Sequence, residues 1–167
     1  MKQPKVIAVA AISLDGKIAY DHERQIETSV EDKRYFERVT REAGTIICGR
    51  RTLDAMKRPL EGRRNVVYTT QADLLAQEPT DELWYTDEPP EQILEKLAAQ
   101  GAETVAVIGG CDIFTMYADL TDEWHLTVCP IWVGEDGVAM GKFSRVRYSL
   151  FKRVPFNSDE ELLILKS

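Results

Sequence analysis

Short apolar runs alternate with helical segments over the first 120 residues of the chain. The strand-like runs are Val6–Ile12, Thr45–Cys48, Asn65–Thr70 and Thr104–Ile108. Nearly continuous hydrophobic runs of this length are typical of parallel strands covered on both faces. The helical segments are Ser29–Ala43, Pro90–Gln100 and Ile113–Leu120. This alternation predicts an α/β fold built on a mostly parallel sheet, with helices on both faces.

The pattern changes after residue 121, where no long helical segment remains. Three further strands are predicted at Glu123–Val133, Val146–Val154 and Glu161–Lys166, and we expect the last two to form an antiparallel edge of the sheet. The segment Glu78–Pro90 holds three prolines and is predicted to be the loosest part of the chain. With 167 residues and no repeat or linker, the sequence is expected to form a single domain over residues 1–167.

The composition argues against several classes of ligand and partner. The chain has 28 acidic and 21 basic residues, a net charge of −7, which disfavours nucleic acid and anionic membranes as partners. The run Val6–Ile12 is too short to span a membrane. Three cysteines without metal-ligand spacing and only two histidines predict no metal site. Unpaired cysteines are typical of a reducing environment, so a cytoplasmic location is expected.

Basic residues are concentrated in one segment of this acidic chain. Six cations fall within fifteen positions: Arg50, Arg51, Lys57, Arg58, Arg63 and Arg64. Only Asp54 and Glu61 oppose them there. Because the arginine fork matches phosphate and carboxylate oxygens, the cluster indicates an anionic small-molecule ligand. A solvated basic loop is the alternative interpretation.

Three predicted strands end in residues that suit a phosphate-rich ligand. These ends are Gly49-Arg50-Arg51-Thr52, Thr69-Thr70 and Gly109-Gly110. Ligands of parallel sheets lie at the carboxyl ends of the strands, where glycine admits a phosphate and a helix N-terminus offers free N–H groups. The convergence predicts a dinucleotide site, although the sequence has neither GxGxxG nor a P-loop. Arginines in place of an acid favour NADP, which carries a 2′-phosphate.

Asp32 is the candidate catalytic acid. It lies four residues before Phe36 and seven before Val39, on the inward stripe of the predicted helix. A carboxyl group in an apolar environment has a raised pKa, which suits a proton donor near neutral pH. Helix capping is the alternative, because Ser29 and Asp32 also have the spacing of a capping box. His125 is interpreted as structural.

Taken together, these motifs resemble the dihydrofolate reductase superfamily, with its three-layer α/β fold, over nearly the whole chain. Cys48–Thr52, Arg58–Val67, Thr69-Thr70 and Val107–Gly110 are similar to dihydrofolate reductase itself. Ser13–Ala19, Thr28–Asp32 and Asp122–Pro130 with Gly134 are similar to the reductase domain of riboflavin biosynthesis.

The resemblance implies NADPH as the cofactor and a role for each matching residue. The implied cofactor-binding set is Ala19, Gly49, Arg50, Arg51, Thr52, Thr69, Thr70, Ile108, Gly109 and Gly110. Asp32 and Thr127 take the catalytic positions, as acid and hydroxyl partner. Phe36 and Arg63 take substrate positions, with Arg63 against a carboxylate or phosphate.

The implied activity is hydride transfer from NADPH to a small pyrimidine- or pterin-type substrate, as in 5-amino-6-(5-phosphoribosylamino)uracil reductase. Dihydrofolate reductase and a non-catalytic NADP-binding module are the alternatives. The chain lacks the Pro-Trp pair of dihydrofolate reductase, has Cys111 where a third glycine is usual, and contains no deaminase motif. These departures bear on the substrate more than on the cofactor. The riboflavin branch favours a homodimer.

Overall fold

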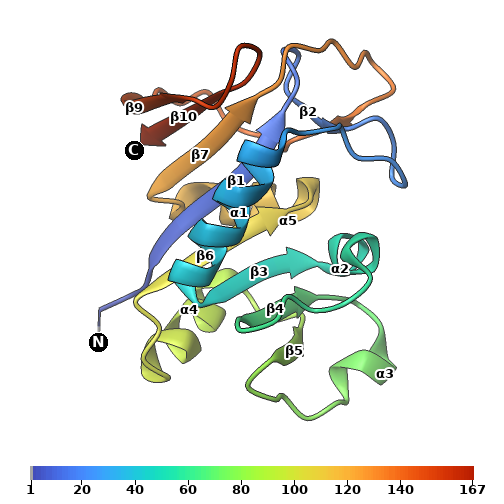
Figure 1. Ribbon diagram of the computed structural model, residues 1–167. Coiled ribbons are helices and arrows are strands. Elements are labelled where there is room, and N and C mark those ends of the chain that lie inside the picture. The colour runs from blue at the N-terminus through green and yellow to red at the C-terminus, as the bar shows by residue number, and fades with distance from the viewer. Residues whose placement is uncertain (1) are drawn as a thin grey trace.

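A computed structural model describes residues 2–167 of the chain. Within them lies an eight-stranded sheet of order β5-β4-β3-β6-β1-β7-β10-β9 (Figure 1). Its strands are β1 (Lys5–Ile12), β3 (Thr45–Gly49), β4 (Arg64–Tyr68), β5 (Leu83–Thr86), β6 (Thr104–Gly109), β7 (Glu123–Val128), β9 (Ser149–Pro155) and β10 (Glu161–Lys166). The strands from β5 to β7 pair in parallel. Strand β10 pairs antiparallel with both β7 and β9. The mixed sheet with an antiparallel C-terminal edge confirms the predicted fold class.

Helices cover both faces of the sheet. The first face carries α1 (Val30–Ala43) and α2 (Arg50–Met56), where Val39 packs against Val9 and Ile46, and Leu53 against Cys48. The other face carries α4 (Pro90–Ala99) and α5 (Cys111–Tyr117). There the buried residues Ile93, Leu97, Phe114 and Tyr117 pack against Val6, Ile47 and Val105. Figure 1 shows α1 crossing in front of the sheet.

Shorter elements complete the chain. They are β2 (Lys17–Ala19), which pairs with β8 (Val138–Ala139), α3 (Ala72–Leu75) and the single turn η1 (Ala118–Leu120). Helix α1 follows its N-cap Ser29 directly, as the sequence predicted. None of the helices in the described part of the chain is long and apolar enough to cross a membrane.

The structure corrects two predictions about elements. The segment Glu78–Pro90 is not uniformly loose, because it contains the edge strand β5, in which Trp84 and Thr86 are buried. Four residues among prolines give too short a pattern to be recognised in advance. The strand predicted to reach Val133 ends at Val128, two residues before Pro130, which has no N–H to donate to a ladder.

Candidate active site

The carboxyl ends of β3, β4 and β6 lie side by side. Cys48 on β3 pairs with Gly109 on β6, and Gly49 pairs with Tyr68, the last residue of β4. The glycine-rich and threonine-rich strand ends that the sequence singled out are therefore neighbours at one edge of the sheet. Figure 1 shows this edge beside α2, with β2 beyond the end of β1.

The two consecutive glycines at the end of β6, Gly109 and Gly110, bring the backbone close to the first turn of α2. Gly109 has φ of 114°, and a Cβ atom on it would lie 3.0 Å from Cε2 of Phe114, so a side chain at this position is strained in conformation and in space. A Cβ on Gly110 would lie 3.8 Å from Oγ1 of Thr52. Because neither glycine has a side chain, a ligand can approach the backbone closely between Thr52 and the Gly109-Gly110 pair.

Two helices begin at this edge without side-chain caps. The N-cap of α2 is Gly49 and that of α5 is Gly110, and neither can accept a hydrogen bond through a side chain. The first N–H groups of a helix need an external acceptor and favour an anion. The donors and the open backbone fit the phosphates of a dinucleotide.

Arg50 and Arg51 stand on the first turn of α2. The Nη1 atom of Arg50 donates to Oδ2 of Asp54 at 2.9 Å, and this pair is largely exposed. Arg51 is exposed, and its Nη1 lies 3.3 Å from Nδ1 of His22. Neither guanidinium is committed to a buried contact, so both can turn toward an anion at the strand ends.

The other predicted cofactor residues surround the same edge. The buried Thr69 accepts a hydrogen bond from the N–H of Gln71 at 3.1 Å, whereas Thr70 is exposed. Ile108 packs between the two clusters beneath α1 and α2. Ala19, on β2, is buried and pairs with Val138 of β8.

The turn that precedes β2 is held by Asp15. Its carboxylate accepts hydrogen bonds from the Ser13 hydroxyl at 2.6 Å, from the N–H of Val133 at 3.1 Å and from the N–H of Gly134 at 2.8 Å. These hydrogen bonds hold the pKa of Asp15 well below its usual range. Asp15 thus lies in the turn between β1 and β2, and its side chain also holds the loop after β7 in place.

Asp32 is not the residue that completes the cap of α1. The Ser29 hydroxyl accepts from the N–H of Asp32 at 3.1 Å, but the N–H of Ser29 donates to Glu160 at 3.1 Å, and the Ser29 hydroxyl donates to Glu160 at 2.6 Å. Glu160, from the turn before β10, therefore occupies the place that a capping box gives to Asp32. The Asp32 carboxylate has no hydrogen-bond partner among residues 2–167.

Thr127 faces the same side of the sheet as α1. Glu123, His125 and Thr127 lie two residues apart on β7 and therefore share one face of the strand. Because His125 contacts Tyr35 of α1, Thr127 also points to the α1 side. Thr127 is only 2% exposed. Cys129 lies two residues further on, and burial together with the nearby Glu160 and Asp32 carboxylates raises the pKa of its thiol to about 12.

Phe36 and Arg63 differ in what they offer a substrate. Phe36 is half-buried against the cluster under α1. Arg63 is 5% exposed, and its Nη1 donates to Oε2 of Glu37 at 3.1 Å and to Oγ1 of Thr40 at 2.9 Å, while its Nε donates to the Glu61 carbonyl at 2.9 Å. These contacts favour a structural role on α1, and the prediction that Arg63 binds a substrate anion stays untested.

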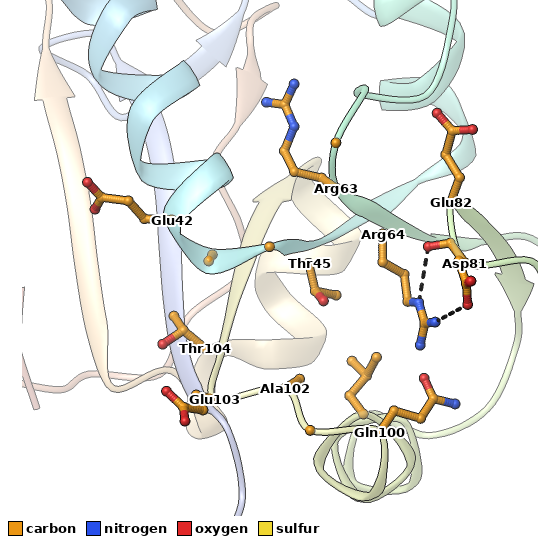
Figure 2. Close-up of a pocket in the computed structure, with 15 residues that line it drawn as sticks. Glu42, Thr45, Arg63, Arg64, Asp81, Glu82, Gln100, Ala102, Glu103 and Thr104 are labelled. Atoms are coloured by element: carbon orange, nitrogen blue, oxygen red, sulfur yellow. Dashed lines mark hydrogen bonds and ion pairs between the residues drawn. The ribbon is translucent and has the colours of Figure 1, made fainter.

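A groove of about 660 Å³ opens at the opposite, amino-terminal edge of the sheet (Figure 2). It is lined by residues from the starts of β3, β4 and β6 and from the end of α4. Arg64 crosses it to Asp81, with Nη2 to Oδ1 at 3.0 Å, and Figure 2 shows Arg63 turned away from this pair. The groove lies away from the strand ends that bring the glycines together.

The sequence matches a known protein family over nearly its whole length. The family model of dihydrofolate reductase matches residues 5–164. The chain belongs to the dihydrofolate reductase family. Within that family, the dihydrofolate reductases of Mycobacterium tuberculosis strains CDC 1551 / Oshkosh and H37Rv are 49% identical to it over 49 residues. That segment covers 28% of this chain and 30% of each enzyme.

Solved structures with the same fold include proteins of riboflavin biosynthesis. The Thermotoga maritima diaminohydroxyphosphoribosylaminopyrimidine deaminase/5-amino-6-(5-phosphoribosylamino)uracil reductase matches 98% of this chain and 56% of its own, with 19% identity and a TM-score of 0.79. Acinetobacter baumannii RibD matches 98% of this chain and 58% of its own, with 18% identity and a TM-score of 0.80. A Shewanella sp. PV-4 protein assigned to riboflavin biosynthesis matches 97% and 98%, with 21% identity and a TM-score of 0.80. This chain thus spans little more than half of the first two.

Three residues that make long-range contacts, Glu160, His22 and Tyr35, were not predicted from the sequence. Glu160 bonds to Ser29 at the start of α1, 131 positions away in the sequence. No local sequence pattern predicts a contact over that separation. His22 lies beside Arg51. Tyr35 bonds to His125. The alternation around His125 was the available signal, whereas Tyr35 lines up along the helix with the charged residues Glu31, Arg38 and Glu42, which predicts a position toward solvent.

Proposed function

We propose that this chain is an NADPH-dependent reductase that transfers hydride to a small pyrimidine- or pterin-type substrate. The observation that carries the proposal is the convergence of Gly49 with Gly109 and Gly110, in which Thr52 lies 3.8 Å from the Cβ position of Gly110. This edge combines open backbone, two uncapped helix N-termini and two arginines. Membership of the dihydrofolate reductase family supports the same assignment.

The choice of NADPH over NADH rests on Arg50 and Arg51. Both guanidinium groups lie on the first turn of α2 and are held only by exposed partners. A 2′-phosphate offers them a doubly charged acceptor that the ribose hydroxyl of NADH lacks. We expect NADPH to bind at least roughly tenfold more tightly than NADH, a difference of about 1.4 kcal/mol.

Asp32 and Thr127 would handle the proton. Bound NADPH supplies the hydride to the carbon of a C=N bond. The nitrogen would then need one proton, and we assign its donation to Asp32, whose carboxyl group is not used by the cap of α1. The buried Thr127 hydroxyl would orient the proton-bearing group. Asp32 regains its proton from solvent, so the step consumes one hydride and one proton.

The test begins with binding and continues with turnover. NADPH and NADH are titrated by fluorescence, and NADPH oxidation is then followed with 5-amino-6-(5-phosphoribosylamino)uracil. Asp32→Asn is expected to lower turnover by about a hundredfold or more while NADPH affinity changes less than about twofold. An unchanged rate would remove Asp32 from the mechanism, and a failure to bind NADPH would overturn the proposal.

Dihydrofolate is the second candidate substrate. The segment that is 49% identical to the mycobacterial dihydrofolate reductases favours it. Steady-state kinetics with dihydrofolate separate the two reductases, because only one substrate should be turned over efficiently. Tight NADPH binding without oxidation by either substrate would instead indicate a non-catalytic NADP-binding module.

A further inference from the structure

A buried hydrogen-bonded chain joins β7 to α1. Oε2 of Glu123 lies 2.9 Å from Nε2 of His125, and Nδ1 of the same imidazole bonds to the hydroxyl of Tyr35. Glu123 and His125 are 8% and 7% exposed. Tyr35 lies one turn after Asp32 on α1. The hydrogen-bonded series Glu123–His125–Tyr35 therefore ends one helical turn from the proposed proton donor.

The protonation states of the three groups follow from their surroundings. Burial raises the pKa of Glu123, but hydrogen bonds from Lys5 and His125 outweigh it and bring the pKa to about 2. Burial lowers the pKa of His125, and Glu123 offsets this only in part. Burial also raises the pKa of Tyr35 to about 12. A neutral His125 therefore donates from Nε2 to the Glu123 carboxylate and accepts at Nδ1 from the Tyr35 hydroxyl.

Charged and aromatic groups from the neighbouring elements surround Glu123, His125 and Tyr35. Lys5 of β1 lies 2.6 Å from Oε1 of Glu123, and Lys166 of β10 lies 3.4 Å from the same atom. The guanidinium of Arg38 lies 5.2 Å from the centre of the Tyr35 ring. Glu42 of α1 adds a further negative charge near Tyr35, and Phe156, beyond β9, packs on its ring at 5.7 Å. The ring is therefore clamped on several sides, and its one polar atom is directed at His125.

We propose that Tyr35 and His125 are positioning residues that fix the first turns of α1 on β7, and thereby the place of Asp32 relative to Thr127. The sheet holds Thr127 rigidly, because β7 pairs with both β1 and β10. Asp32 lies on a helix whose start is held by Ser29 and Glu160. Among residues 2–167, the bond between Tyr35 and His125 is the only side-chain hydrogen bond that joins α1 to β7.

The kinetic consequence rests on the proposed reductase function, whereas the structural consequence does not. A catalytic group displaced by about 1 Å can lose a hundredfold in rate. Loss of the Tyr35 hydroxyl is therefore expected to lower the rate of proton transfer. The cofactor edge should be unaffected, because it is built from β3, β6, α2 and α5.

The first experiment compares Tyr35→Phe with Lys33→Ala, an exposed change on the same helix. In Tyr35→Phe we expect amide hydrogen exchange over residues 30–36 to accelerate about tenfold. We also expect kcat to fall about tenfold while the Kd for NADPH stays within about twofold. Lys33→Ala should change none of these quantities. Unchanged exchange in Tyr35→Phe would overturn the proposal, as would accelerated exchange with unchanged kcat in an active enzyme.

The second experiment uses His125→Asn, which retains an acceptor near the position of Nδ1 but cannot titrate. Acid should release Tyr35 from His125 in the wild-type protein, because a protonated imidazole no longer accepts at Nδ1. The protection factors of the amides of residues 30–36, which correct exchange for its intrinsic pH dependence, should therefore fall in the wild type as the pH drops below the ordinary imidazole value of about 6.5. They should not change with pH in His125→Asn. The same acid response in both proteins would contradict the proposal. If no substrate is reduced by the wild type, the reductase proposal fails while the exchange measurements still decide this one.

Discussion

Arg51 and Arg63 belong to one basic segment of the sequence, yet the fold gives them opposite surroundings. Arg51 is exposed on the first turn of α2, beside His22 and the open strand ends. Arg63 is 5% exposed, and its guanidinium is held by Glu37, Thr40 and a backbone carbonyl. One arginine is available to a ligand, and the other fastens the loop before β4 to α1.

The difference shows that a charge cluster in a sequence is not by itself a binding surface. Arginine binds an anion when its donors are free, and stabilises a fold when its donors are already used. Removal of each side chain should therefore affect a different measured quantity.

The largest expected effect is on stability at Arg63. Arg63→Met keeps much of the apolar stem but removes the donor to Thr40 and to Oε2 of Glu37. It should lower the free energy of unfolding by about 2–4 kcal/mol. Urea denaturation measures the change, and NADPH affinity of the folded variant should be unaltered. Glu37→Gln, which keeps Arg63 buried and bonded to Thr40, is the milder control. A stable Arg63→Met variant with impaired substrate binding would instead support the predicted substrate role.

Charge reversal at Arg51 should produce the next largest effect, on affinity. Arg51→Glu is expected to raise the Kd for NADPH about 30-fold, which is roughly 2 kcal/mol. Its free energy of unfolding should change by less than about 0.5 kcal/mol. Fluorescence titration measures the Kd, and Arg58→Glu provides the same charge change at an exposed position. Equal losses of NADPH affinity in both variants would mean that the summed positive charge of the segment matters, and not a specific contact of Arg51.

A third, smaller effect is the pH dependence of stability. It should distinguish the contact of α1 with Arg63 from its contact with His125. Arg63 does not titrate, but the folded pKa of His125 is depressed by burial. Its neutral form therefore stabilises the fold above the unfolded pKa of about 6.5, and this contribution is lost as the pH falls below that value. Urea melts at a series of pH values should show the slope in the wild type and a shallower one in His125→Asn. An equal slope in Arg63→Met is expected, because that attachment is independent of pH.

The smallest effect on stability is expected at Arg64, another arginine of the same basic segment. Arg64 pairs with Asp81, whose side chain is fully exposed. Asp81→Asn should change the free energy of unfolding by no more than about 0.5 kcal/mol. A loss comparable to that of Arg63→Met would show that exposure does not rank these contacts.

Much of the fold was predictable because it depends on local patterns. The apolar runs placed β1, β3, β4 and β6, and β10 was predicted with the bounds that the structure shows. Strand β5 was missed, because its four residues become a strand only by pairing with β4. The site divides in the same way. The glycines at the strand ends were visible in the sequence, whereas the hydrogen bond from Ser29 to Glu160 joins residues 131 positions apart.

Local sequence patterns were enough to predict the alternation of strands and helices, and with it the edge where Gly49, Gly109 and Gly110 meet, because hydrophobic period and glycine placement act over a few residues. Packing between distant segments turns Arg63 inward and makes Glu160, rather than Asp32, the residue that completes the cap of α1. The same packing brings Tyr35 to His125, 90 positions away. Burial and hydrogen-bond partners arise when distant segments pack, and they determine which charged groups stay available to a ligand.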